Sequence, residues 1–297
     1  MEERALTREE LREQEPLTYR QEVTRRLRRK PIAILGFTLL MVVGFSSLFA
    51  PWVAPYDPAK QGLSRPFSPP SATHLFGTDQ FGRDVFSRVI YGGRISLQVG
   101  LIAVVIGGGL GLVLGALAGY AGGWTDEVIM RLIDIKLAFP GILLAIAVVV
   151  MLGPGLYNVM IAVGIGTVPT FTRVVRASVL AAKDRDYVVA ARALGASDLS
   201  IMVRHILPNV IAPFVVLVTL DVATAILSGT ALSYLGMGAK PPTPEWGLML
   251  SDGRDFIRYA WWVGTFPGLA ITLTVIGINL LGDGLRDALD PRLRGTR

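Results

Sequence analysis

Few side chains in this sequence are of the types that bind metals or carry out catalysis, and they are scattered along the chain. The two histidines, His74 and His205, are too far apart to form a cluster by themselves, and there is no cysteine. Asp79 follows His74 closely, but a metal site needs three or four protein ligands, and no third ligand stands near this pair. We therefore expect no metal site, and without cysteine there is no disulfide or thiolate site.

The motifs of nucleotide-dependent and hydrolytic enzymes are also missing from the sequence. No segment matches G-x-x-x-x-G-K-[ST], which binds nucleotide phosphates, and none matches H-E-x-x-H or the nucleophile motif G-x-S-x-G. The glycine-rich run GGGLGLVLG lacks the spacing of a dinucleotide-binding loop and lies within an apolar stretch. We predict that the chain is not an enzyme, binds no cofactor itself, and takes any energy it uses from other proteins.

The composition indicates a protein embedded in a membrane. Of the 297 residues, 52% are hydrophobic and only 18% are charged, whereas a soluble domain normally carries about 25% charged residues. Tracts such as 142–151 and 210–220 contain no charge at all. The net charge of +6 does not require a nucleic-acid partner, because the inner loops of membrane proteins are rich in lysine and arginine.

Six stretches are long and apolar enough to cross a bilayer, which takes about 20 mainly apolar residues. They lie at about 32–50, 95–120, 129–151, 156–172, 207–232 and 261–281. The sequence therefore predicts an all-α membrane protein with six transmembrane helices. Pro140 and Pro213 fall within the third and fifth stretches, where each removes a backbone donor and can kink its helix.

The distribution of lysine and arginine predicts the orientation. With the N-terminus inside the cell, 21 of the 29 basic residues fall on the inner side and 8 on the outer side. Because inner loops carry the excess of basic residues, both termini are expected to be cytoplasmic. The protein would then be a multi-pass protein of the cytoplasmic membrane.

The predicted spans divide the chain into five parts. These are a cytoplasmic N-terminal segment (1–30), a first transmembrane helix (31–50), an extracytoplasmic loop (51–94), a core with five transmembrane helices (95–284) and a cytoplasmic tail (285–297). The basic N-terminal segment either lies on anionic membrane lipid as a helix or is a positively charged flank that fixes the orientation. The orientation rule favours the flank.

Two features of the spans suggest roles inside the membrane. Glycine lets neighbouring helices approach closely in lipid, and the second span repeats it every four residues at Gly107, Gly111, Gly115, Gly119 and Gly123. We interpret this stripe as a helix-packing surface in preference to a wide solute-lining face. Asp221 is the only charge deep in the fifth span, so it should face protein or water, either as a residue of a solute pathway or as one partner of an interhelical bond.

A polar stretch, AARALGASDLSIMVRHILPN (190–209), interrupts the apolar pattern on the cytoplasmic side. It predicts a short helix over Asp186–Leu194, a glycine C′ residue at Gly195, and a second helix from about Leu199 to Ile206, capped by Ser197 or Asp198. The spacing also fits a DNA-binding helix–turn–helix, but the second helix runs straight into a span and could hardly enter a groove. We therefore favour a docking element for a cytoplasmic protein, and expect no nucleic-acid partner.

This stretch resembles the EAA loop of binding-protein-dependent ABC importer permeases. The segments HLFGTDQFGRDVFSRVIYGGRISL (74–97), DEVIMRLIDIKLAFPGILLAI (126–146) and GDGLRDALDPRLR (282–294) are similar to the dipeptide/oligopeptide/nickel branch of that family. The resemblance extends from the first span to the tail. It is closest to the C-type subunit, the second of two permeases.

The resemblance implies the ABC importer permease fold and a set of partners. These are a sister permease subunit, two ATP-binding subunits that hold ATP and magnesium, and an extracytoplasmic solute-binding protein. The polar loop, about 173–206, would be the coupling element that docks in a groove of an ATP-binding subunit. Its contact residues would be Asp186, Ala190, Ala191, Arg192, Gly195 and Ala196. The family's leading glutamate is replaced by Val189 here, and Asp186, one turn earlier, could substitute for it.

The resemblance favours import of short peptides over import of nickel or another small solute. A stand-alone channel or secondary transporter is an alternative of a different class, because Asp221 could serve an ion path. Neighbouring genes that encode ATP-binding subunits and a secreted binding protein would distinguish an importer from this alternative.

Overall fold

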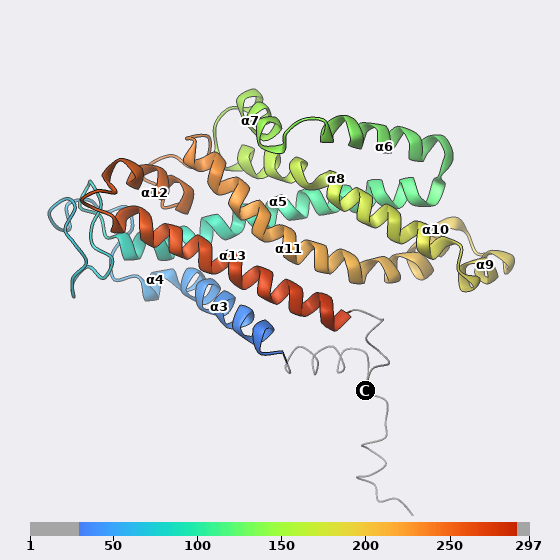
Figure 1. Ribbon diagram of the computed structural model, residues 1–297, viewed down its shortest axis with the longest axis horizontal. Coiled ribbons are helices and arrows are strands. Elements are labelled where there is room, and N and C mark those ends of the chain that lie inside the picture. The colour runs from blue at the N-terminus through green and yellow to red at the C-terminus, as the bar shows by residue number, and fades with distance from the viewer. Residues whose placement is uncertain (1–29, 290–297) are drawn as a thin grey trace, which may run out of the picture.

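The computed structural model describes residues 30–289, and these residues are almost entirely helical. Five long helices are apolar enough to cross a membrane: α3 (Pro31–Leu48), α5 (Val85–Ala121), α8 (Leu156–Lys183), α11 (Leu207–Tyr234) and α13 (Trp262–Leu289). They run alongside one another in an elongated bundle (Figure 1). The N-terminal segment and most of the cytoplasmic tail lie outside the described residues.

A sixth span is present only as a broken pair of helices. The helices α6 (Gly123–Leu137) and α7 (Gly141–Leu152) meet at an angle of 93°. Pro140 lies at this break as the N-cap of α7, and its missing N–H and its ring end the preceding helix. Pro213, by contrast, lies inside α11 without ending it. The third predicted span therefore exists as two pieces with different directions.

Short helices complete the chain at the two ends of the bundle. The elements α4 (Ala50–Val53), α12 (Trp246–Gly253) and the 3₁₀ turn η2 (Arg254–Phe256) lie at one end. At the other end lie α9 (Asp186–Ala193), α10 (Asp198–Ile201) and the π-helix η1 (Met202–Ile206), which leads into α11. The orientation predicted from the basic residues makes the α9–α10 end cytoplasmic.

The start of α3 and the end of α13 lie together, because Lys30 forms an ion pair with Asp287. Both ends point away from the α12 end of the bundle (Figure 1). This arrangement agrees with the prediction that the chain enters and leaves the membrane region on the same side.

The most extensive helix contact is that of α5 with α8. Glycines of α5 allow the two helices to approach each other closely. A β-carbon on Gly111 would lie 2.3 Å from Cβ of Phe171, and one on Gly115 would lie 2.6 Å from the carbonyl oxygen of Thr172. Neither position can hold a larger side chain unless the helices move apart.

The same face of α5 continues at Gly107 and Gly119, which also contact α8. A β-carbon on Gly119 would lie 2.9 Å from Cβ of Val179. Gly123 is different: it begins α6, and an added β-carbon there would meet nothing within 4 Å. The stripe that contacts α8 therefore consists of Gly107, Gly111, Gly115 and Gly119.

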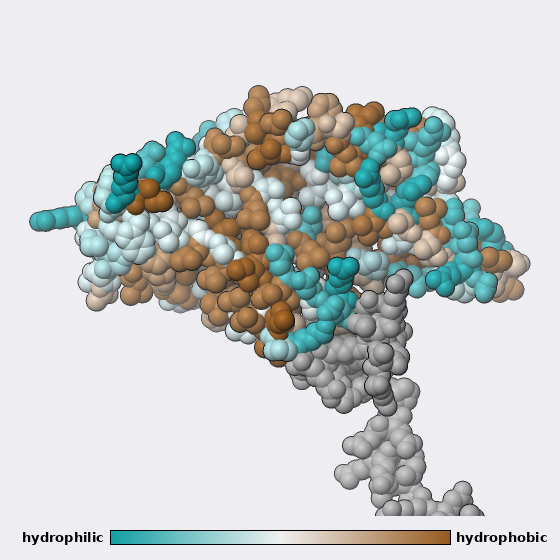
Figure 2. Space-filling model, in the orientation of Figure 1, coloured by the Kyte–Doolittle hydropathy of each residue, from teal (hydrophilic) through white to brown (hydrophobic). Residues whose placement is uncertain are grey.

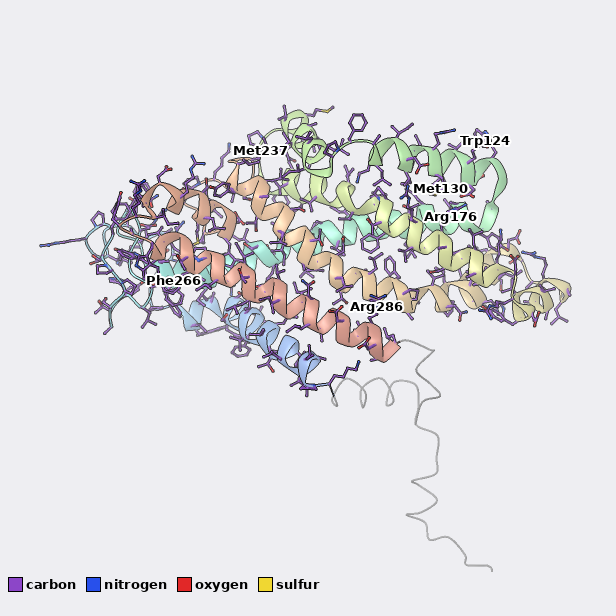
Figure 3. All side chains as sticks on the ribbon, in the orientation of Figure 1. Trp124, Met130, Arg176, Met237, Phe266 and Arg286 are labelled. Carbon is purple, nitrogen blue, oxygen red and sulfur yellow. The ribbon has the colours of Figure 1, made fainter. Side chains whose placement is uncertain are left out.

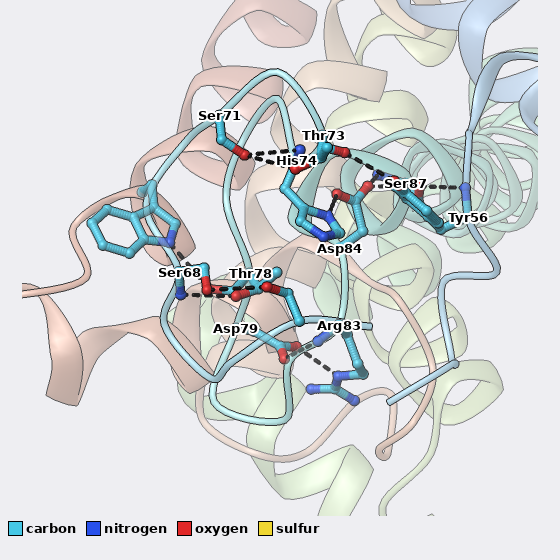
Figure 4. A network of polar contacts seen from close by, with 12 residues as sticks. Tyr56, Ser68, Ser71, Thr73, His74, Thr78, Asp79, Arg83, Asp84 and Ser87 are labelled. Atoms are coloured by element: carbon cyan, nitrogen blue, oxygen red, sulfur yellow. Dashed lines mark hydrogen bonds and ion pairs between the residues drawn. The ribbon is translucent and has the colours of Figure 1, made fainter. Parts of the chain in front are cut away.

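The outer loop between α4 and α5 is held by buried polar contacts (Figure 4). Asp84 caps α5 by accepting a hydrogen bond from the Ser87 amide at 2.8 Å, and it also contacts Nδ1 of His74 at 2.9 Å. Asp79 instead pairs with Arg83 at 2.6 Å. His74 and Asp79 thus have separate partners and do not form a shared site.

The helix that Asp84 caps starts earlier than the sequence predicted. The helix α5 starts at Val85, ahead of the second predicted span, which began at about residue 95. The outer loop is correspondingly shorter than the predicted range 51–94. Polar residues at the start of α5 hid the helix from a search for apolar runs, although an aspartate N-cap is a recognisable start signal.

Candidate functional site

The strongest candidate site is the polar connection between α8 and α11, at the end of the bundle opposite α12 (Figure 1). The helix α8 continues to Lys183, past Thr172, where the fourth span was predicted to end. The first part of the predicted loop, 173–183, is therefore helical and belongs to α8. What remains is a compact connection over residues 184–206.

The first half of this connection contains the predicted helix, which is terminated by the predicted glycine. The helix α9 ends in two crossed hydrogen bonds, from the Gly195 amide to the carbonyl of Arg192 and from the Ala196 amide to the carbonyl of Ala191. This is a Schellman ending, which needs a left-handed residue at C′. Gly195 supplies it with φ of 81°, as predicted.

The second half begins with the predicted serine cap. The Ser197 hydroxyl oxygen accepts a bond from the Ser200 amide and starts α10. The chain then passes through the π-helix η1 before α11 begins, with Pro208 in its first turn. A π-helical turn in a helix often marks a functional position, and here it joins the connection directly to a span.

One face of the connection packs onto the bundle. Val188, Ile201 and Ile206 are fully buried and form a cluster with Val175 and Val179 of α8. Ala191 belongs to the same cluster and is only 8% exposed. The side chain of Ala191 therefore faces the interior of the bundle, whereas the sequence had predicted that it contacts a docking protein.

The opposite face is exposed and includes two large apolar side chains. Leu194 is 88% exposed and Leu199 is 74% exposed. Sequence reasoning missed these leucines; their position on either side of the Gly195 turn is the signal that could have indicated them. The other proposed contact residues on this face are exposed or, for Ala196, half-buried: Asp186, Ala190, Arg192, Gly195 and Ala196.

Two tyrosines connect the site to the spans. The Tyr120 hydroxyl at the end of α5 donates to Asp198 of α10, and Asn209 of α11 donates to the Tyr187 hydroxyl of α9 at 3.1 Å. With the buried cluster on α8, these contacts bind the connection to three membrane helices.

The sequence of the chain matches two known protein families. Residues 111–295 match the family described as "Binding-protein-dependent transport system inner membrane component", and residues 18–70 match the "N-terminal TM domain of oligopeptide transport permease C". The first match covers more than half of the chain. The chain belongs to this family of transport permeases.

Curated relatives resemble the permease over nearly its whole length. It is 50% identical to the "Di/tripeptide transport system permease protein DppC" of Pseudomonas aeruginosa, with 89% of each chain covered. It is 49% identical to the "Glutathione transport system permease protein GsiD" of Escherichia coli, with 92% of this chain and 91% of the relative covered.

A solved structure supports the fold. The permease superposes on a chain of the MetNI methionine ABC transporter, in an inward-facing conformation, with a TM-score of 0.59. The match covers 69% of this chain and 97% of that chain at 19% identity. At this identity the likeness establishes the fold alone, and it agrees with the predicted ABC importer permease fold.

The surface agrees with a location in the cytoplasmic membrane. Figure 2 shows hydrophobic residues over the middle of the bundle and hydrophilic residues gathered towards its two ends. Large apolar side chains such as Val105 and Val113 of α5 are more than half exposed. In water such a surface would be unstable, whereas in lipid it is solvated by acyl chains.

Asp221, the proposed pathway residue, lies on α11 away from the α9–α10 connection. Its Oδ2 atom is buried and has no hydrogen-bond partner among the described residues. The hydroxyl of Thr167 lies beside it but donates to the carbonyl of Gly164 at 3.0 Å. The structure thus places Asp221 beside Thr167 of α8, with no donor to its Oδ2 atom among the described residues.

Proposed function

We propose that this permease is one of two membrane subunits of an ABC importer that moves short peptides into the cell. The observation that carries the proposal is the exposed Leu194–Leu199 surface at the cytoplasmic end of a bundle of this family. An exposed apolar pair outside the membrane region indicates a protein partner.

The proposed partners follow from the family and from what the chain lacks. The permease contains no phosphate-binding motif, so ATP and magnesium would be held by two ATP-binding subunits. One of them would dock on the α9–α10 connection. A sister permease would complete the membrane part, and an extracytoplasmic binding protein would deliver the solute at the α12 end.

The geometry of the connection supports a role in coupling. Movement of the ATP-binding subunits would displace α9 and α10, which are held to α5, α8 and α11 by the buried cluster and the two tyrosine contacts. Because packed helices shift as rigid bodies between discrete arrangements, this displacement would move the spans. The chain would thus convert closure of its partners into opening of a solute path.

Short peptides are the proposed solute because curated relatives at about 50% identity are named as di/tripeptide, dipeptide and glutathione permeases. Nickel or another small solute is the second candidate within the branch. A stand-alone channel or secondary transporter is less well supported, because neither would need the exposed leucine pair. Peptide uptake that requires both ATP and a binding protein would distinguish these possibilities.

The test replaces both exposed leucines in the reconstituted importer. Complete burial of a leucine stabilises a contact by about 1.5–3 kcal/mol, so the double variant Leu194→Ser, Leu199→Ser should weaken docking of the ATP-binding subunit by at least about tenfold. Binding-protein-stimulated ATP hydrolysis and peptide uptake should fall together. The matched control is Leu194→Met with Leu199→Met, which keeps the apolar surface and should retain both activities. Wild-type activity of the serine variant would contradict the proposed docking surface.

A further inference from the structure

A seam of charged side chains joins α6 to α8. Arg176 of α8 holds Asp126 of α6 with two parallel hydrogen bonds of 2.5 Å each. Arg173 of α8 pairs with Asp134 of α6 at 2.7 Å. Lys136, at the end of α6, donates to the backbone carbonyl of Gly166. Polar contacts thus follow the whole length of α6.

This seam descends through the inner half of the membrane region. At a rise of about 1.5 Å per residue, Gly166 lies about 15 Å along α8 from Leu156, and Arg173 and Arg176 lie about 25 and 30 Å along it. The hydrocarbon core is about 30 Å thick. If α8 enters the core near Leu156, the contacts run from the middle of the membrane to its cytoplasmic boundary.

The seam is open on one side. A groove there is lined by Asp126, Glu127, Met130, Arg131, Asp134 and Arg176. Arg173 and Asp134 remain about half exposed although they are paired, with 52% and 55% of their side chains accessible. Glu127 and Arg131 are exposed and form no ion pair with any described residue. The groove therefore presents charges of both signs.

A groove of this kind cannot face the lipid acyl chains. Ionisable side chains within the membrane region are costly there and lie against protein or a water-filled space. In a transport permease, a polar groove that opens near the cytoplasmic boundary, on a seam of contacts that continues through Lys136 to the middle of the membrane, is suited to carry solute. We propose that the seam between α6 and α8 forms the cytoplasmic half of the solute path, and that it takes zwitterionic solutes such as short peptides.

The chemistry of the seam matches a peptide with free termini. Such a peptide carries an ammonium group and a carboxylate, the same two kinds of charge that meet in the pair of Asp126 and Arg176. A terminal ammonium can take the place of the arginine at Asp126, and a terminal carboxylate can take the place of the aspartate at Arg176. Each charge then exchanges one partner for another as the solute passes. The substrate class assumed here rests on the proposed function.

The connections of α6 allow the seam to widen. Gly122 and Gly123 join α6 to α5 with φ of 66° and 51°, and no atom lies within 4 Å of a β-carbon added to either. The other end of α6 is the break at Pro140. Ile133 is the only buried residue of α6, so its attachment to α8 depends mainly on the polar contacts. Solute charges that compete for these contacts would release α6 from α8.

The test uses the fact that the chain has no cysteine. Met130→Cys places a single thiol in the groove, and Trp124→Cys is the matched control on the same helix but outside the groove, where the side chain is 78% exposed (Figure 3). Each variant is assembled with cysteine-free partners in inside-out vesicles that enclose the binding protein and peptide, and uptake by the importer is measured as peptide released into the medium. A charged, membrane-impermeant methanethiosulfonate reagent is then applied from the cytoplasmic side.

We expect modification of Met130→Cys to abolish most peptide uptake. A transported dipeptide that fills the path about nine tenths of the time should slow the modification about tenfold. Modification of Trp124→Cys should be insensitive to the peptide and should leave uptake unchanged. Equal rates at Met130→Cys with and without peptide, or complete modification with full uptake, would overturn the proposal and indicate a groove filled by lipid headgroups or by another subunit.

A second variant examines the charges themselves. The double substitution Asp126→Asn, Arg176→Gln removes both charges; asparagine keeps the shape of aspartate, while glutamine is polar but shorter than arginine. We expect peptide uptake to fall at least about tenfold, the loss of one charge-assisted interaction, while binding-protein-stimulated ATP hydrolysis stays near the wild-type rate. Equal loss of both activities would show that the pair supports the fold or the coupling, and not the solute path. If the proposed function is wrong, the unmodified wild-type complex itself takes up no peptide.

Discussion

Replacing Gly195 with valine should impair coupling to the ATP-binding subunits without preventing the permease from folding. Gly195 has φ of 81°, and an added β-carbon would meet no atom within 4 Å. Any effect of the substitution must therefore arise from the backbone itself. A left-handed conformation costs an ordinary residue about 1–2 kcal/mol, and the penalty is larger for a β-branched one.

That strain is sufficient to change the ending of α9. A penalty of about 1.4 kcal/mol lowers the equilibrium population of the native turn about tenfold relative to alternatives. If the turn opens, the two hydrogen bonds that close α9 are lost, and Leu194 no longer keeps its position beside Leu199. The spans do not depend on this turn, so Gly195→Val should insert normally and lose most stimulated ATP hydrolysis and uptake.

Gly236 provides a matched control for this experiment. It closes α11 with the same pair of crossed bonds, has φ of 80°, and likewise has no atom near an added β-carbon. Gly236→Val thus imposes the same strain at the opposite end of the bundle and should keep stimulated ATP hydrolysis. Asparagine tolerates the left-handed region, so Gly195→Asn should be much milder than valine. Wild-type hydrolysis in Gly195→Val, or equal losses in the two valine variants, would refute the reasoning.

Three further predictions concern packing, a helix cap and orientation. Gly111→Leu should prevent assembly because its β-carbon alone would overlap α8, while Gly109→Leu on the open face of α5 should assemble; size-exclusion chromatography measures both. Glu245→Ala removes the buried carboxylate that accepts from two amides at the start of α12, so the protein should lose about 1–3 kcal/mol of stability and melt at a lower temperature. Single cysteines at Ala5 and Thr296 should resist an impermeant thiol reagent in intact cells, and labelling of either would contradict cytoplasmic termini.

The helices were predictable where hydrophobicity alone decides the structure. Long apolar runs identified five unbroken spans and the region of the broken one, because burial in lipid requires about 20 such residues. The boundaries were less accurate where a helix carries charges beyond the apolar run. Charged Arg173 and Arg176 made α8 seem to end early, although both continue the helix and find partners on α6.

The local structure of the connection was also predictable, because it depends on a few adjacent residues. Gly195 and Ser197 take the backbone roles expected of them. The direction of each side chain was not predictable. Ala191 proved to be buried against α8, so Ala191→Glu would disrupt the permease's own core and would not test docking. Which face of a short helix is covered depends on contacts with residues distant in the sequence.

The proposed coupling surface and the proposed solute path share one helix. Beyond Pro169, α8 continues unbroken through Arg173 and Arg176 to Lys183, and only two residues separate it from α9. A continuous helix transmits a displacement along its axis with little loss, because each turn is fixed to the next by hydrogen bonds. A shift of the connection would therefore move Arg173 and Arg176 relative to α6, whose ends are a glycine pair and a proline break. Closure of the docked ATP-binding subunit would then be linked to release of charges in the seam through one movement of α8.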